Sequence, residues 1–284
     1  MTMPETLAPS LAVPPLRGLL RGWRGIFALG FQSALIYRWG FFLRVFSSLL
    51  PLIVTWFVWG AVYQGKGTLG GYSWASMMAY YFALLILDNG FAPTEDDFQI
   101  AADIRDGKIS QILLRPLNYG AYRFLLFVSS RAAHLLFAAL PLAAILWYFR
   151  EVFVDVPLHR TLLPALVAFC GSAVLQFAVS FMTGLLAFWL LEVGGIVFIL
   201  FSLEFLVGGH IFPIDLLPEP WRTLAICSPF ASQYWFPVSV LLGHVEGAAL
   251  WKGFALQAFW IGAALTLAAF IWKRGLKRYT AVGG

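Results

Sequence analysis

Six long apolar blocks, separated by short polar joints, dominate this chain of 284 residues. Each block has about the 20 residues that a helix needs to cross a hydrocarbon layer of about 30 Å. Only helices or closed barrels can cross such a layer, because every backbone N–H and C=O must find a partner within the protein. The blocks lack the alternation of barrel strands, which favours helices. The fold class that we predict is an all-α polytopic membrane protein with six transmembrane helices. The blocks cover Phe41–Tyr63, Tyr72–Phe91, Ala121–Phe149, Leu162–Leu191, Gly194–Ile211 and Ala248–Trp272.

Composition and charge agree with a chain that lies mostly in lipid. Hydrophobic residues make up 61% and charged residues 12% of the chain, against about 45–50% and about 25% in soluble proteins. The net charge of +5 does not indicate a nucleic-acid partner, because the basic residues lie at the ends of the blocks. Phospholipid headgroups are the expected partner of cations at that position.

The distribution of Lys and Arg predicts the orientation. Of the 19 basic residues, 13 fall on one side of the layer if the amino terminus lies on that side, 5 fall on the other, and Arg131 lies inside the third block. Cytoplasmic flanks carry the excess of positive charge, so we expect both termini to be cytoplasmic.

The ends of the chain differ from the apolar body, which we place at residues 16–273. Residues 1–15 contain four prolines and no basic start, which is typical of a disordered cytoplasmic tail rather than a signal peptide. Residues 16–42 combine arginines with apolar residues at helical spacing, which predicts an interfacial helix or, alternatively, a helix packed on the neighbouring spans. Residues 274–284 form a basic cytoplasmic tail.

The segment 92–120, between the second and third blocks, is patterned. It begins with acidic residues, as helix starts do, and continues with apolar residues at amphipathic spacing. Gly107 predicts a break between two short helices, and Pro116 predicts the end of the second. A short helix with an apolar face at the inner surface could bind a soluble partner, whereas a plain solvated connector remains the alternative.

Prolines divide the region 208–247 after the fifth block into short apolar pieces. They predict helical segments that enter the membrane from the outer side and return, which requires a covering of protein or a water-filled cavity. Phe230–Leu242 could alternatively be a seventh span, but it is short and broken by Pro237. The residues that define this element are Gly208, Gly209, Phe212, Pro213, Pro218, Trp221 and Pro229.

Arginine, histidine and glutamate also occur well inside the apolar blocks, away from their ends. Arg131 and His134 share one face of the third block, and Glu204 lies in the fifth. Charges at that depth are costly and often functional, so we consider a translocation path or an interface, against a structural ion pair. The dispersed histidines give no support for a metal site. Gly60–Gly67 nearly fits a phosphate-binding loop, but glycine replaces the Mg²⁺-binding hydroxyl and no strand precedes it.

Taken in this order, the segments resemble the bacterial ABC-2 family permeases, the membrane subunits of type V ABC exporters. The likeness rests on the basic amphipathic helix, six spans with both ends inside, and the outer glycine- and proline-rich element. It also rests on Ile-Arg-x-Gly-x-Ile (Ile104–Ile109) followed by Leu-Leu-x-Pro from Leu113. The resemblance places the chain in a bacterial plasma membrane as an exporter of a hydrophobic or amphipathic solute.

The resemblance also implies the partners. Two cytoplasmic ATPase subunits would bind ATP and Mg²⁺, so this chain would hold no cofactor and would not itself be an enzyme. A second permease subunit, identical or related, would pair through the first and fifth spans, near Glu204. Coupling to the ATPase would involve Ile104, Arg105, Gly107, Lys108, Ile109, Leu113 and Pro116. A stand-alone channel or ion-coupled carrier, and a membrane enzyme or scaffold, are the alternatives.

Overall fold

The computed structural model describes residues 24–32, 38–91, 96–114 and 117–279. Residues 24–32 are helical. The other elements are α2 (Arg38–Val62), β1 (Thr68–Leu69), β2 (Tyr72–Ser73), α3 (Trp74–Phe91), α4 (Asp96–Arg105), α5 (Lys108–Leu113), α6 (Tyr119–Tyr148), η1 (Arg150–Phe153), α7 (Leu158–Leu185), η2 (Leu186–Phe188), α8 (Gly194–Val207), η3 (Ile214–Leu216), α9 (Trp221–Ile226), α10 (Pro229–Gln233), α11 (Trp235–Leu241) and α12 (Gly247–Arg278).

Each of the six apolar blocks contains one helix, so the all-α polytopic class is confirmed. Among the residues that the structure describes, four helices are long and apolar enough to cross a membrane: α2, α6, α7 with η2, and α12. Helix α3 has 18 residues and α8 only 14. At 1.5 Å per residue, α8 spans about 21 Å, less than the hydrocarbon layer. Six full crossings therefore stay a prediction.

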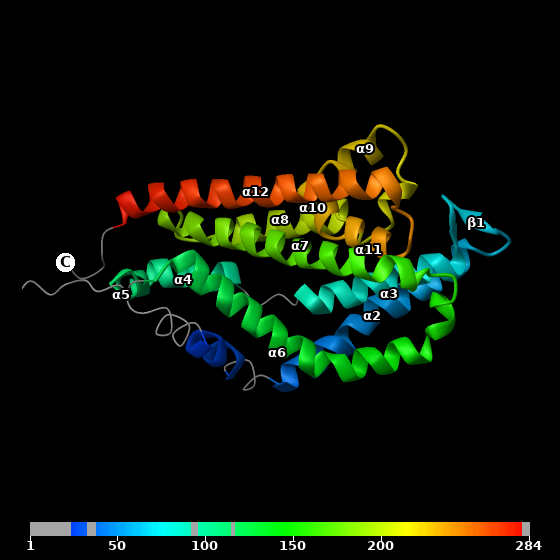
Figure 1. Cartoon of the computed structure of the whole chain (residues 1–284), viewed down its shortest axis with the longest axis horizontal. Coiled ribbons are helices and arrows are strands. Elements are labelled where there is room, and N and C mark those ends of the chain that lie inside the picture. Colours follow the sequence, from blue (N-terminus) through cyan, green and yellow to red (C-terminus); the bar gives the residue numbers. More distant parts are fainter. Residues whose placement is uncertain (1–23, 33–37, 92–95, 115–116, 280–284) are drawn as a thin grey trace, which may run out of the picture.

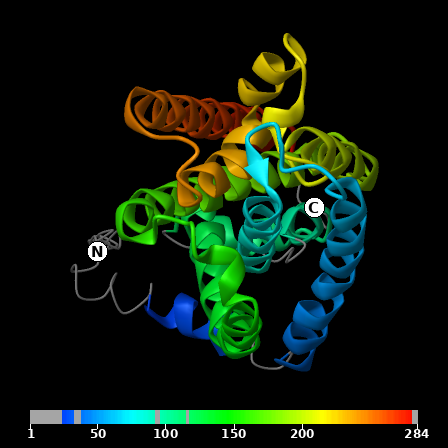
Figure 2. The ribbon, with the colours of Figure 1, turned by 90° about the vertical axis from the view of Figure 1, so that its right-hand side faces the viewer.

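The helices form one elongated bundle (Figure 1). Helices α7 and α12 lie side by side along its length, whereas α2 and α3 occupy the half that carries the β-hairpin. Helices α4 and α5 lie at the opposite end, beside the last turns of α12. We call these two ends the β1 end and the α5 end. Figure 2, viewed from the β1 end, places α2 and α12 on opposite sides of the bundle.

The core is divided between the two ends. Towards the β1 end, α2, α3, α11 and the nearby parts of α6 and α7 enclose one apolar cluster. Towards the α5 end, α4, α5, α12 and the other parts of α6 and α7 enclose a second. All seven residues of α11 are buried. Helices α10 and α11, with 5 and 7 residues, are each far shorter than a membrane span.

The hairpin at the β1 end joins α2 to α3. Thr68 pairs with Ser73 and Leu69 with Tyr72 in antiparallel register. The two-residue turn between them is Gly70–Gly71, with φ of 56° and 87°. Two successive positive φ angles fit the tight turn that matches the twist of a hairpin, and glycine adopts them without steric cost.

Some predictions fall on residues that the structure does not describe. The tail 1–15, Pro116 and the last residues of the tail 274–284 lie outside the described ranges. The interfacial segment 16–42 is described only for residues 24–32 and from Arg38 onward, where α2 has already begun. Helix α12 continues to Arg278, so the described part of the basic tail is helical.

Candidate functional site

Helix α4 packs tightly on α7 at the α5 end. Two aspartates occupy its first turn, where their negative charge interacts favourably with the positive end of the helix dipole. Ile100 and Ile104, four residues apart, are buried on one face. A Cβ built on Gly184 of α7 would lie 2.7 Å from the Cβ of Ile100 and 2.8 Å from the carbonyl oxygen of Asp97. This approach is possible only because residue 184 has no side chain.

A glycine separates α4 from α5, where the sequence predicts a break. Gly107 has a φ of 74°, in the left-handed region that glycine adopts without strain. Ile109 of α5 is fully buried, which holds the short helix on the bundle. The end of α5 is open to solvent, because Leu113 is 45% and Leu114 88% exposed. Two exposed leucines therefore stand beside one another at the α5 end.

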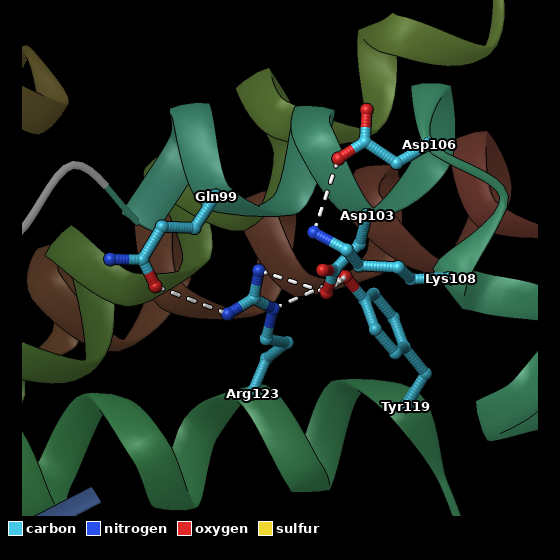
Figure 3. Close-up of polar contacts among 6 residues, drawn as sticks. All are labelled: Gln99, Asp103, Asp106, Lys108, Tyr119 and Arg123. Atoms are coloured by element: carbon cyan, nitrogen blue, oxygen red, sulfur yellow. Dashed lines mark hydrogen bonds and ion pairs between the residues drawn. The ribbon is translucent and has the colours of Figure 1, made fainter. Parts of the chain in front are cut away.

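A buried polar cluster joins α4 to the start of α6 (Figure 3). Arg123 Nη2 lies 3.0 Å from Asp103 Oδ2, and the Tyr119 hydroxyl donates to the same oxygen at 3.0 Å. Arg123 also donates from Nε to the Tyr119 oxygen at 3.2 Å and from Nη1 to Gln99 at 3.3 Å. The cationic side chain thus binds both helices at once and is buried within the protein.

A second ion pair lies deeper along α6. Arg131 Nη1 is 2.7 Å from Asp96 Oδ2, and both side chains are largely buried. The guanidinium also lies over the ring of Phe127, 3.5 Å from its centroid. His134, one turn further along α6, is buried as well. Arg131 therefore forms an ion pair within the protein, and its place in a translocation path or an interface stays a prediction.

Weaker contacts link α4 and α5 to the neighbouring segments at the α5 end. Arg105 donates to the carbonyl of Leu191 at 2.9 Å and lies 3.6 Å from the carboxylate of Glu192, at the joint between α7 and α8. Ser110 of α5 and Tyr279 after α12 form a hydrogen bond of 3.0 Å. Helices α4 and α5 are therefore linked to α6, α7, α12 and the start of α8, so a displacement of the segment would reach all of them.

The structure divides the predicted coupling residues into two groups. Ile104 and Ile109 face the core. Arg105, Lys108 and Leu113 are exposed, with Lys108 paired to Asp106 at 3.1 Å (Figure 3). Gly107 forms the joint between the helices. The exposed group, together with Leu114, makes up the surface that we call the α5 surface. The last two turns of α12 add Lys273, Arg274, Lys277 and Arg278, all exposed.

At the β1 end, tyrosines of α3 hold the loop that follows α8. Gly208 and Gly209 are buried there. The Tyr80 hydroxyl donates to the carbonyl of Gly209 at 2.8 Å, and the Tyr81 hydroxyl to that of Ile211 at 2.6 Å. Gly209 has a φ of 98°, and a Cβ built on it would lie 2.4 Å from the Tyr80 oxygen. Glycine is required at this position by conformation and by space.

Asp215, in the region that follows α8, binds three side chains at the β1 end. Its Oδ2 accepts hydrogen bonds from the Tyr72 hydroxyl at 2.7 Å and from Trp235 Nε1 at 2.8 Å. Its Oδ1 lies 3.3 Å from Arg222 Nη2. One carboxylate therefore joins the hairpin, α9 and α11. The sequence analysis did not select Asp215, since a single aspartate in a loop carries no pattern.

The remaining residues of the predicted re-entrant element lie at different depths. Pro213 is buried and Phe212 half-buried, whereas Pro218 is exposed. Trp221 begins α9 and is 64% exposed, on the part that projects from the bundle in Figure 1. Pro229 is the first residue of α10, after Ser228, whose side chain accepts from the N–H of Ala231. The structure brings these segments together, and their entry into the membrane from the outer side stays a prediction.

We expect Asp215→Asn to loosen the β1 end. One of the two carboxylate oxygens becomes an amide nitrogen, so either Arg222 or the Tyr72 and Trp235 pair loses its acceptor. A partly buried donor left without a partner costs about 1–3 kcal/mol. The measurement is the free energy of unfolding in mixed micelles, with exposed Asp155→Asn as the matched control. Equal stability of the two variants would contradict the role of Asp215.

The predicted intramembrane residues do not form one site. Arg131 and His134 lie on α6, and Arg131 binds Asp96. Glu204 lies on α8, where its carboxylate is hydrogen-bonded to Tyr234. Tyr234 interacts electrostatically with both Arg131 and Glu204. Within the described ranges, no group of three or more His, Cys, Asp or Glu residues is arranged to hold a metal ion.

The long apolar helices and the charge pairs buried between them define a multi-pass helical membrane protein. The sequence profile of the family described as ABC-2 family transporter protein matches residues 49–283. The chain therefore belongs to the ABC-2 family of transporter proteins, which confirms the resemblance, and it is a membrane-transport component. No curated protein sequence matches it.

Proposed function

We propose that this chain is the permease subunit of an ATP-driven exporter that moves a hydrophobic or amphipathic solute out of a bacterial cytoplasm. The observation that carries the proposal is the family match over residues 49–283. Members of this family generally work with ATPase subunits. ATP and Mg²⁺ would bind to two such partner subunits, and this chain would supply the path through the membrane.

The α5 surface is where we place the ATPase contact. Leu113 and Leu114 offer apolar area, and Arg105 and Lys108 surround it with positive charge. A partly apolar patch with a charged rim is the composition of a protein–protein interface. In the proposed orientation, this surface and both termini lie on the cytoplasmic side.

The contacts of α4 and α5 supply a route for the coupling. Force on the α5 surface reaches α4 through a joint of two residues, Asp106 and Gly107. Helix α4 is held to α6 by two ion pairs and to α7 by the close approach at Gly184. ATP would bind one arrangement of these helices more tightly than the other. Its effect is limited to that difference in binding free energy.

A second permease subunit would lie against α2 and α8, the helices of the first and fifth blocks. Helix α8 supports this placement, because none of its residues is buried within the chain. Its large apolar side chains, Phe198, Phe201 and Phe205 among them, are exposed. They are available to lipid or to a partner helix.

The test of the proposed function is purification of the chain from its native membrane in mild detergent, followed by mass spectrometry of the intact complex. We expect two ATPase subunits with two permease subunits, and the masses show whether the permeases are identical. A chain that purifies alone and transports solute in liposomes without ATP would instead favour the stand-alone channel or carrier.

The placement of the ATPase contact has its own test. We expect Leu114→Glu to weaken ATPase binding at least about tenfold, because it puts a charge into an apolar contact. Val154→Glu is the control, since Val154 is 77% exposed at the β1 end. The measurement is the amount of ATPase retained by each variant at equal expression. Equal retention would show that the ATPase does not bind at the α5 surface. It would not contradict the exporter proposal.

A further inference from the structure

Four side chains from separate segments meet at the loop that follows α8. His210 Nε2 lies 3.2 Å from Asp88 Oδ1 of α3. Glu204 of α8 interacts electrostatically with both of them and is hydrogen-bonded to Tyr234, which lies between α10 and α11. We call these four residues the Glu204 cluster. Only Glu204 of the four is predicted from the sequence, because the other members are dispersed along the chain.

The cluster has aromatic walls and one open side. The His210 ring lies 4.3 Å from that of Tyr234 and 5.2 Å from that of Phe205, measured between centroids. The His210 side chain is 10% exposed, whereas that of Asp88 is 44% exposed. A ligand can therefore reach the cluster beside Asp88.

The charges of the cluster do not balance. It contains two carboxylates, and its one internal cation is His210 when protonated. Arg131 also interacts electrostatically with Tyr234, but it is paired with Asp96 at 2.7 Å. With both carboxylates ionised, at least one negative charge remains without a counter-charge. An unbalanced charge among apolar helices is costly, so the cluster favours either a proton on one carboxylate or an additional cation beside it.

We propose that the Glu204 cluster binds the positively charged group of an organic cation, such as a protonated or quaternary amine. The carboxylates supply the counter-charge, and the ring of Phe205, a residue that is 46% exposed, suits a cation that carries apolar groups. A metal ion is the poorer fit, because the described residues contain no set of three metal ligands. The assignment rests on the proposed export function and narrows its solute to cationic amphiphiles.

The test uses two probes of the same shape and opposite charge, tetraphenylphosphonium and tetraphenylborate, with the purified full chain in neutral detergent. We expect the phosphonium to bind and the borate not to bind. Asp88→Asn and Glu204→Gln should each weaken phosphonium binding at least about tenfold, because each removes one counter-charge. Glu246→Gln, an exposed residue at the start of α12, is the matched control and should bind as the unmodified chain does.

The variant His210→Asn tests whether the cluster binds the cation through its charge or only holds the loop after α8 in place. It removes the cation that competes with the ligand, so phosphonium should bind as tightly as before or more tightly. Weaker binding by this variant would indicate that the cluster only holds the loop in place and would overturn the proposal. Unchanged binding by the two acid variants, or equal binding of the borate, would also overturn it.

A measurement on the unmodified chain tests the proposal even if the variants fail to fold. Carbodiimides label carboxyl groups in apolar surroundings, and mass spectrometry identifies the labelled residue. Phosphonium should protect Glu204 or Asp88 from labelling, and borate should not; absence of protection contradicts the assignment. None of these readouts involves the ATPase. A complex that contains the ATPase but lacks this binding would overturn the cation site alone.

Discussion

Arg131→Met is expected to destabilise the protein by about 3–5 kcal/mol, because it leaves the buried carboxylate of Asp96 without its cation. The arginine lies 2.7 Å from that carboxylate, and the two side chains are only 8% and 12% exposed. Methionine fills a similar volume, so the loss reports the charge rather than a cavity. The measurement is the free energy of unfolding in mixed micelles.

Two controls identify the cause. Arg150→Met removes an exposed arginine just after α6 and should change stability by less than about 0.5 kcal/mol. Combining Arg131→Met with Asp96→Leu removes both charges, and apolar replacement of a whole buried pair is often neutral. The double variant should therefore recover most of the loss. If it is as unstable as Arg131→Met alone, the pair is not the reason for the effect.

The sequence predicts the position of the helices well because hydrophobic length and period are local properties. Each apolar block contains a helix, and the break at Gly107 lies where the pattern places it. The length of α8 is less well predicted. The apolar block extends to Ile211, but the helix ends at Val207, where two glycines follow and Tyr80 binds the turn. Apolar character continues past the helix because the loop is also buried.

The pairing of α4 with α6 was not predicted, although the sequence contains a signal for it. Asp96 and Asp103 are about two helical turns apart. Arg123 and Arg131 have nearly the same spacing. The observed pairs are Asp96 with Arg131 and Asp103 with Arg123, the order that antiparallel helices require. A structural ion pair was one of the alternatives for Arg131, and the spacing of the acidic and basic residues indicates which carboxylate each arginine binds.

Contacts between distant segments could not be predicted at all. The Glu204 cluster joins residues 88, 204, 210 and 234. No local period links these positions, because their meeting depends on how short helices fold back after α8. The charges of such a site can be listed from the sequence, but the balance between them depends on the fold.

Gly184→Ala is expected to displace α4 from α7 and abolish coupled transport. Alanine adds one carbon, which would lie 2.7 Å from the Cβ of Ile100 and 2.8 Å from a backbone oxygen of α4. Neither atom is the flexible end of a side chain, so the helices must separate. Alanine in place of glycine favours a helix interior by about 1 kcal/mol. Destabilisation by this substitution can therefore come only from the contact.

The matched control is Gly262→Ala in α12, where an added carbon would meet nothing within 4 Å. That variant should be neutral or slightly stabilised. Backbone amide hydrogen exchange measures the separation directly, and we expect residues 96–105 to exchange at least about tenfold faster in Gly184→Ala and unchanged in Gly262→Ala. Faster exchange together with normal ATP-driven transport would show that α4 is not the route by which the ATPase moves the spans. Unchanged exchange would show that α7 accommodates the extra carbon, and the close contact would then have no special role.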